Sequence, residues 1–147
     1  MPSLDNLQIR LLAEHDSAVL ERVAPDVFDH AIRPELAREF LADPRHHLAV
    51  AIVDSTVIGF ASGVHYLHPD KPPELFVNEV GVAPPWQRRG IGKPVIRVLL
   101  DHAKSLGCRS AWVATEPDNS AARALYGSAG GVEDTMRYVI YEFAISS

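Results

Sequence analysis

Apolar and polar positions recur with two different periods along the chain, and the two periods separate strands from helices. Runs rich in β-branched and aromatic residues predict strands, and they fall at 7–12, 47–53, 57–66 and 75–82. A polar triplet at 54–56 divides the second run from the third and predicts a hairpin turn, whereas the proline-rich residues 67–73 predict a loop. The middle of the chain therefore predicts a meander of three strands.

Helical spacing is clearest in the segment 91–106, where apolar side chains recur every three or four residues. Pro94 falls in the first turn, where a missing N–H costs little, and Gly107 follows as a natural C-cap. Shorter helices are predicted at residues 18–23, 35–41 and 120–129, the last with Asn119 as its N-cap, and further strands at 110–115, 132 and 137–143.

The order of these elements predicts the fold class. One strand and two helices precede the meander, and a helix, a strand, a helix and a last strand follow it. Such an order favours an α/β (α+β) fold, with a mixed, mostly antiparallel central sheet and helices on both faces. No repeat or linker divides the sequence, so residues 1–147 are expected to form a single domain.

Composition narrows the classes of function. The 147 residues are 47% hydrophobic and 22% charged, with a net charge of −5, which argues against a general binder of nucleic acid or anionic membranes. No apolar run approaches the roughly 20 residues of a membrane span, and the first residues lack the segments of a signal peptide. Cys108 is the one cysteine, as expected of a protein in the reducing cytoplasm.

A short glycine-containing segment, Gln87-Arg88-Arg89-Gly90-Ile91-Gly92, lies between the strand 75–82 and the helix 91–106. A strand, a glycine turn and a helix together present free backbone N–H groups and a partial positive charge to an anion. Charge is distributed accordingly, because residues 86–100 contain four cations and no acid. The segment predicts a site for an anionic ligand, with a solvated helix face as the alternative explanation of the charges.

Two common phosphate-binding motifs do not fit this segment. A P-loop requires a glycine where Gln87 stands and a serine or threonine where Pro94 stands. A dinucleotide fingerprint requires a third glycine at the position of Val95. The remaining pattern, Gln-x-x-Gly-x-Gly, resembles the core motif of the GNAT N-acetyltransferase superfamily, and the order of elements over residues 7–143 resembles the same superfamily.

The resemblance implies a fold, a cosubstrate and a set of binding residues. In the GNAT superfamily this motif wraps the pyrophosphate of acetyl-coenzyme A (acetyl-CoA), and the strand before the motif bonds the pantetheine arm through its backbone. By resemblance, the cofactor-binding residues are Val80, Gly81, Val82, Gln87, Arg88, Arg89, Gly90, Ile91, Gly92, Lys93 and Asn119. For Asn119 the plain alternative is a helix cap, and the two roles are compatible.

Catalytic roles follow from the same resemblance together with the chemistry of acyl transfer. Glu79, late in the strand 75–82, matches the carboxylate that takes the proton from the amine, and its alternative is an exposed strand residue or a binder of a cationic substrate. Tyr126, in Ala124-Leu125-Tyr126, matches the residue that protonates or stabilises the leaving thiolate, with packing on the sheet as its alternative. A backbone amide near Val80 or Gly81, at a bulge, would stabilise the oxyanion.

The acceptor is expected to be a primary amine, and the chain resembles the aminoglycoside 3-N-acetyltransferases within the superfamily, with other small amines or a peptide amine as alternatives. The resemblance makes Glu133 and Asp134, together with Asp26 and Asp29, candidates for contact with a cationic substrate, while His65 is a candidate because its strand lies beside that of Glu79. A structural role is the alternative for His65. No metal site is expected, because the histidines lack cysteine or acidic partners at ligand spacing.

Two hypotheses follow from the sequence. The first is an acetyl-CoA-dependent N-acetyltransferase that acts in a ternary complex, without nucleic-acid or membrane partners, and paired as a homodimer through its last strands as members of the superfamily often are. The second is a sensor or interaction module that binds acetyl-CoA without turnover. Retention of both Glu79 and Tyr126 favours the enzyme, because binding alone requires neither residue.

Overall fold

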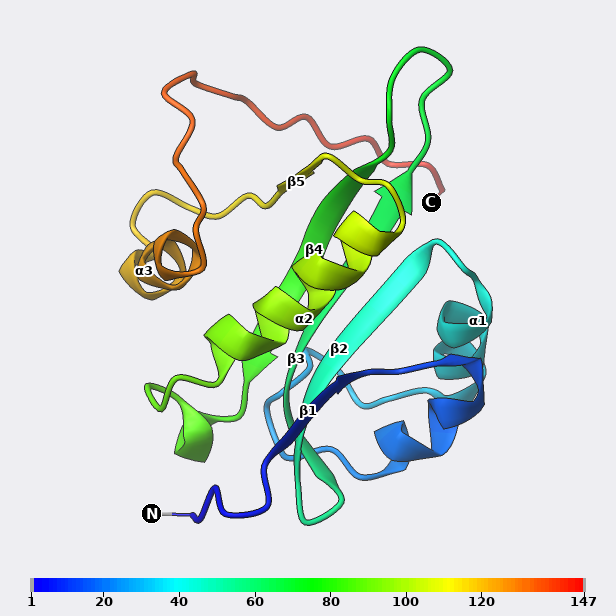
Figure 1. The fold of residues 1–147 in the computed structure, drawn as a ribbon, viewed down its shortest axis with the longest axis vertical. Helices are drawn as coiled ribbons and strands as arrows, with labels where there is room; N and C mark the ends of the chain where they lie inside the picture. The colour runs from blue at the N-terminus through cyan, green and yellow to red at the C-terminus, as the bar shows by residue number, and fades with distance from the viewer. Residues whose placement is uncertain (1, 147) are drawn as a thin grey trace.

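A computed structural model describes residues 2–146 of the chain. Its elements, in chain order, are β1 (Gln8–Leu11), the 3₁₀ helix η1 (Glu14–Glu21), α1 (Pro34–Ala42), β2 (His46–Val53), β3 (Thr56–Tyr66), β4 (Glu74–Val82), the 3₁₀ turn η2 (Pro84–Trp86), α2 (Gly92–Ser105), β5 (Ser110–Trp112) and α3 (Ser120–Ser128). These elements build one five-stranded sheet with helices on both faces (Figure 1), which confirms the predicted fold class.

The strands of the sheet lie in chain order, β1-β2-β3-β4-β5. The first four pair antiparallel, and only β4 and β5 pair parallel. The β2–β3 turn holds Asp54 at φ 49° and Ser55 at φ 66°, the left-handed conformation that two-residue hairpin turns require. Parallel pairing of β4 with β5 requires a crossover, and α2 supplies it.

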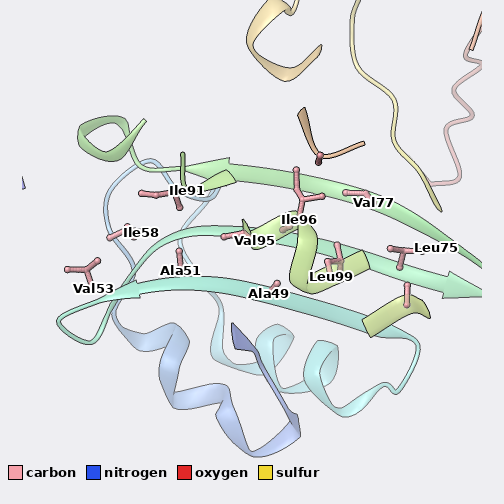
Figure 2. Close-up of a cluster of buried hydrophobic side chains, with 13 residues drawn as sticks. Ala49, Ala51, Val53, Ile58, Leu75, Val77, Ile91, Val95, Ile96 and Leu99 are labelled. Atoms are coloured by element: carbon pink, nitrogen blue, oxygen red, sulfur yellow. The ribbon is translucent and has the colours of Figure 1, made fainter. Parts of the chain in front are cut away.

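Helix α2 covers one face of the sheet, and its apolar stripe forms the larger core. Figure 2 shows Val95, Ile96 and Leu99 of α2 lying over small side chains of β2 such as Ala49 and Ala51. Leu75 and Leu99 are completely buried in this core. The small residues of β2 allow the helix to approach closely, and they fix α2 along β3 and β4 with its N-terminus beside the end of β4.

The opposite face of the sheet is covered by η1 and α1, which form a second core with alternate residues of β2 and β3. Leu20 of η1 and Leu41 of α1 are buried against Val50 of β2. The aromatic rings of Phe28 and Phe60 stack at a centroid distance of 3.9 Å, which attaches the loop between η1 and α1 to β3. This loop therefore has a fixed position beside the last residues of β4.

Most predicted elements occur within a residue or two of their expected positions, and three do not. The helix expected at 18–23 is a 3₁₀ helix at Glu14–Glu21, because Asp16 bonds the Ala13 backbone N–H at 2.7 Å and starts the turn earlier. The strand expected at 110–115 ends at Trp112. The strand material expected at 132 and at 137–143 is wrong for this chain, because that segment makes no ladder with any described strand.

Candidate active site

The two strands beside β4 are β3 and β5, and β5 moves away from β4 where the predicted site begins. On one side, β3 pairs with β4 from Glu74 to Val82. On the other side, β5 pairs only with Glu74, Leu75 and Phe76, and then leaves towards α3 (Figure 1). The backbone of β4 beyond Phe76 therefore has no strand partner on the β5 side within the described residues, and its N–H and C=O groups are open to an extended ligand.

A bulge in β4 determines which side chains face the site. The register shifts from Ser62–Glu79 to Gly63–Val77, so that Asn78 is an extra residue on β4. Leu75 and Val77 before the bulge, and Val80 beyond it, all pack into the α2 core, so Glu79 faces the other side of the sheet. The sequence predicted such a bulge near Gly81, and the structure places it at Asn78.

The glycine turn leaves a row of backbone donors without partners. Arg88 has φ 60° and Gly90 has φ 76°, which turns successive amides towards one side of the loop. Within residues 2–146, none of the backbone N–H groups from Arg88 to Lys93 donates to a protein acceptor, and α2 has no side-chain cap at its N-terminus. Polar groups left free at the start of a 14-residue helix form a site suited to a phosphate or pyrophosphate.

The side chain of Gln87 forms a hydrogen bond within the protein and holds this turn in place. Its Nε2 donates to the carbonyl oxygen of Val82 at 2.9 Å, which attaches the turn to the last residue of β4. The turn and the open edge of β4 are therefore held in one arrangement by a side chain that the sequence predicted as a binding residue.

The four cations near the turn divide into two pairs. Arg88 and Lys93 have exposed side chains and no acidic partner among the described residues. The Arg89 guanidinium instead donates to the carbonyl oxygen of Pro2 and lies 5.4 Å from the centroid of the Trp86 ring. Arg97 donates to the carbonyl oxygen of Ala129 at 2.9 Å, so it attaches α3 to α2. Arg88 and Lys93, which have no such contact among the described residues, are thus best placed to move towards an anionic ligand, while Arg89 and Arg97 keep their charge in fixed positions.

Helix α3 lies beside the start of α2 and carries Tyr126. A Cβ added at Gly92 would lie 2.9 Å from a Leu125 methyl, so the glycine allows the two helices to approach. Tyr126 is half-buried against the α2 core, its burial raises the pKa of its phenol, and its hydroxyl has no partner among the described residues. A raised pKa keeps the phenol protonated and able to donate.

Gly131 lies just after α3, where the backbone leaves no space for a side chain. Its N–H donates to the Tyr126 carbonyl oxygen at 2.9 Å, which closes the C-terminus of α3. A Cβ at this position would lie 2.9 Å from the same oxygen, so the tight closure favours glycine.

Asn119 is the N-cap of α3, as the sequence indicated. Its Oδ1 accepts the backbone N–H of Ala122 at 3.1 Å. The residue is exposed, so the cap leaves the amide nitrogen of its side chain free for a second contact.

On the face of the sheet opposite α2, the loop between η1 and α1 forms a cavity of about 590 Å³. The loop touches the end of β4 closely, because a Cβ added at Gly81 would lie 2.5 Å from the Val27 carbonyl oxygen. The cavity lining includes three acids, Glu21, Asp26 and Asp29, and one arginine, Arg38. Glu79 belongs to the same face of β4 as Gly81, and its side chain is exposed.

The remaining candidates lie apart from Glu79 or are engaged elsewhere. His65 packs under the α2 side of the sheet, where its Nδ1 lies 2.7 Å from Nε2 of His47, which also contacts the His102 ring. Glu133 pairs with Arg123 at 2.6 Å, and Asp134 accepts hydrogen bonds from Met136 and Tyr138. The sequence indicated no role for Glu21, and only its position at the end of η1, on the lining of the cavity, identifies it.

Comparison with known proteins identifies the family. The Acetyltransferase (GNAT) family model matches residues 12–130, which include the open end of β4, the glycine turn and α3. The chain belongs to the GNAT acetyltransferase family. Acetyl-CoA is the acetyl donor of this family, and the free amides of the turn are the feature that suits its pyrophosphate.

Curated relatives from the GNAT family act on different amines. The chain is 39% identical over 90 residues to N-alpha-acetyltransferase RimI of Mycobacterium tuberculosis, covering 61% of this chain and 54% of that protein. It is 31% identical over 101 residues to aminoglycoside N(6′)-acetyltransferase type 1 of Salmonella typhimurium, covering 65% and 69%. It is 37% identical over 79 residues to L-2,4-diaminobutyric acid acetyltransferase of Nocardia farcinica, covering 54% and 40%. The chain thus spans about half the length of the first and third relatives.

These relatives support the superfamily, and none of the three is named as an aminoglycoside 3-N-acetyltransferase, so that finer assignment stays a prediction. Solved structures agree on the fold. An aminoglycoside acetyltransferase from an uncultured soil metagenomic sample superposes with a TM-score of 0.78 at 21% identity, covering 97% of this chain and all of that chain. A second aminoglycoside acetyltransferase, AAC(6′)-Iy, superposes with a TM-score of 0.75 at 21% identity, covering 94% and 98%.

Two further findings concern other classes of function. No helix within residues 2–146 combines the length and the apolar character that a membrane crossing requires. The same residues contain no group of three or more histidines, cysteines or acids arranged to hold a metal ion.

Proposed function

We propose that the protein is an N-acetyltransferase that moves an acetyl group from acetyl-CoA to a primary amine by direct transfer in a ternary complex. The observation that carries this proposal is the row of free backbone N–H groups from Arg88 to Lys93, next to the open edge of β4. The free N–H groups of the turn can bind a pyrophosphate, and the unpaired edge of β4 can form hydrogen bonds with an arm that contains amides. Coenzyme A contains both groups.

Each part of coenzyme A has candidate binding residues in this chain. The backbone of residues 88–93 would hold the pyrophosphate, with Arg88 and Lys93 supplying charge. The backbone of Val80–Val82 would bond the pantetheine arm as an added strand, and the free amide of Asn119 would contact the cosubstrate from α3. Bound acetyl-CoA supplies an acetyl group activated as a thioester.

Each proton step has a candidate residue. The exposed carboxylate of Glu79 would accept a proton from the substrate ammonium, directly or through water, which leaves the amine free to attack. The backbone N–H of Val80, next to the bulge, would stabilise the negative charge that develops on the acetyl oxygen. The Tyr126 hydroxyl, kept protonated by burial that raises its pKa, would protonate the departing thiolate.

The acidic cavity indicates the class of acceptor. Glu21, Asp26 and Asp29 line the cavity of about 590 Å³ whose loop touches β4 at Gly81, two residues beyond Glu79. Three carboxylates outweigh the one arginine of the lining, Arg38, and their excess negative charge attracts a cation with several amines, such as an aminoglycoside. We favour an aminoglycoside amine, at the 3- or the 6′-position, over the ribosomal-protein and diaminobutyrate amines named for other relatives.

Calorimetry with acetyl-CoA and a thiol-release assay test the proposal separately. We expect saturable binding of acetyl-CoA, which Lys93→Glu weakens at least tenfold because it places an acid beside the free amides. Lys71→Glu, the same change in the β3–β4 loop, is the matched control and should bind like the wild type. No binding at millimolar concentration would exclude the proposed function.

Turnover is measured on a panel of amines that includes an aminoglycoside, diaminobutyrate and a peptide with a free N-terminal alanine. We expect thiol release with the aminoglycoside, and loss of it in Asp26→Asn combined with Asp29→Asn if the cavity holds the acceptor. Tight binding of acetyl-CoA without turnover on any amine would replace the enzyme with the sensor hypothesis.

A further inference from the structure

A pair of aromatic side chains lies on the two strands that border the candidate site. Phe76 of β4 and Trp112 of β5 are directly paired residues of the parallel ladder. Their rings lie at a centroid distance of 4.5 Å, with an angle of 41° between the ring planes. Trp112 nevertheless remains 49% exposed, so a large part of its ring is open to solvent. We call these two side chains the aromatic platform.

The aromatic platform lies on the same face of the sheet as Glu79. Leu75 and Val77, on either side of Phe76, pack into the α2 core, so Phe76 points to the opposite face. The bulge at Asn78 turns Glu79 to that face as well. With one residue taken up by the bulge, Glu79 is the next side chain on this face after Phe76, roughly 7 Å away at two strand positions of about 3.3 Å each. One sugar ring with its amine can span that distance.

The second core of the protein does not reach this part of the face. The core beneath η1 and α1 includes residues of β2 and β3, but none of β4 or β5 among the residues that the structure describes. The cavity with the three acids lies on the other side of Glu79, because its loop touches β4 at Gly81. The aromatic platform and this cavity therefore flank Glu79 from opposite directions along β4.

Hydrogen bonds hold the aromatic platform in one orientation. The Nε1 of Trp112 donates to the Tyr66 hydroxyl at 2.7 Å, and this hydroxyl donates to Glu74 at 3.3 Å. A ring whose position is already fixed loses little conformational entropy when a ligand lies against it. Because the indole N–H already has an acceptor, the exposed part of the ring suits a ligand that makes apolar and electrostatic contact with an aromatic face.

The charge near the aromatic platform favours a cation. Neither β4 nor β5 contains a lysine or an arginine, and Glu79 is an exposed carboxylate on the same face. The face of an aromatic ring carries the negative part of its quadrupole, and tryptophan attracts a nearby ammonium most strongly. In an aminosugar, the ammonium groups polarise the C–H bonds of neighbouring ring carbons. Such a ring therefore matches both the apolar and the electrostatic character of the aromatic platform.

We propose that the aromatic platform of Phe76 and Trp112 is a second acceptor subsite, on which a ring of an aminosugar stacks while the reacting amine lies at Glu79. This inference rests on the proposed function and narrows it, because it requires a ring next to the reacting amine. A linear amine such as diaminobutyrate could reach Glu79 and the acidic cavity but would gain little from the aromatic platform. The subsite thus favours aminoglycosides over linear amines through KM rather than through the chemical step.

Calorimetry on the full chain, with and without coenzyme A, tests the subsite with kanamycin and with the linear polyamine spermine. We expect Trp112→Ala to weaken kanamycin binding about fivefold or more and to leave spermine binding within about twofold of the wild type. Trp112→Phe also loses the hydrogen bond to Tyr66 but keeps an aromatic ring, so it should recover most of the affinity for kanamycin. Equal kanamycin affinity of Trp112→Ala and the wild type, or an equal loss for spermine, would overturn the proposal.

The unaltered protein provides a second measurement that does not depend on the stability of a variant. The chain has two tryptophans, so a proton–nitrogen correlation spectrum contains two indole N–H signals, which Trp112→Phe or Trp86→Phe assigns. Kanamycin should shift the Trp112 signal in a saturable way and leave the Trp86 signal in place. A titration that shifts neither signal would also contradict the subsite.

Turnover separates a failure of this proposal from a failure of the proposed reaction. Acetyl transfer to kanamycin with the same KM in Trp112→Ala and the wild type would contradict the subsite and leave the reaction intact. Binding of kanamycin at Trp112 without any thiol release would contradict the reaction and leave the binding site intact.

Discussion

The two ends of β4 differ in how fully they are paired. At the Glu74 end, β3 and β5 lie on both sides, and side chains join all three strands: Trp112 Nε1 donates to the Tyr66 hydroxyl at 2.7 Å, and that hydroxyl donates to Glu74 at 3.3 Å. At the Val82 end only β3 remains, a bulge turns the chain at Asn78, and the following turn leaves its amides free.

This difference separates stability from binding within a single strand. At the closed end, backbone groups are satisfied by the protein and contribute to folding. At the open end they have no protein acceptor, which costs stability in the free protein and reserves them for a ligand. The candidate site is thus the part of β4 beyond Phe76, where the backbone N–H and C=O groups on the β5 side have no partner in the sheet.

The largest expected effect is at Gly81, where the loop after η1 meets the open end. Gly81→Ala places a methyl group 2.5 Å from the Val27 carbonyl oxygen, and we expect it to cost about 3 kcal/mol in the free energy of unfolding, measured in urea. Gly127→Ala in α3 meets no atom within 4 Å and should instead stabilise by about 0.5 kcal/mol. Equal stability of Gly81→Ala and the wild type would show that the loop moves freely.

The next effect is a loss of stability in acid at the closed end. Burial, together with His102 and His65, lowers the pKa of His47 to about 4. The unfolded chain protonates His47 near its ordinary pKa of 6.5, so the unfolded state binds more protons and stability falls as the pH falls from 6.5 towards 4. Between about pH 7 and about pH 5 we expect a loss of about 2 kcal/mol from this residue.

Urea unfolding at the two pH values measures that loss, and substitutions assign it. His47→Gln removes the titrating group and should flatten the pH dependence, whereas His30→Gln, at an exposed histidine, should leave it as in the wild type. A pH dependence that His47→Gln does not alter would show that other groups cause it.

A smaller effect is expected on kcat, and it distinguishes two carboxylates of the same strand. Glu79→Gln removes the proposed base at the open end and should lower kcat about tenfold or more, equivalent to about 1.4 kcal/mol. Glu74→Gln changes the same group at the closed end, where it bonds Tyr66 and His68, and should leave kcat within about twofold. Equal rates for Glu79→Gln and the wild type would remove the proposed base.

The smallest effect concerns the start of α3. Asn119→Ala removes the hydrogen bond to the Ala122 N–H and should cost about 1 kcal/mol of stability. If Asn119 also contacts coenzyme A, its dissociation constant rises several-fold in calorimetry. A loss of stability alone would leave Asn119 as a cap and exclude the contact.

Local patterns predicted much of this molecule, because they depend on interactions between residues close in sequence. The period of 91–106 placed α2, the polar triplet at 54–56 placed the hairpin, and Gln87 to Gly92 placed the donors of the turn. The end of β5 and the path of residues 132–146 were not predictable in this way. A strand needs a neighbour to pair with, and the apolar composition of residues 138–145 does not state whether such a neighbour is present.

By itself, the sequence determined most of the elements, the order in which they occur and the glycine turn, since propensity, capping and periodicity act over a few residues. Only the tertiary structure decided that the bulge at Asn78 turns Glu79 away from the α2 core, that His65 lies with His47 and His102, and that the η1–α1 loop both forms a cavity and contacts β4 at Gly81. These outcomes depend on register and on contacts between segments far apart in the chain, which no local pattern contains.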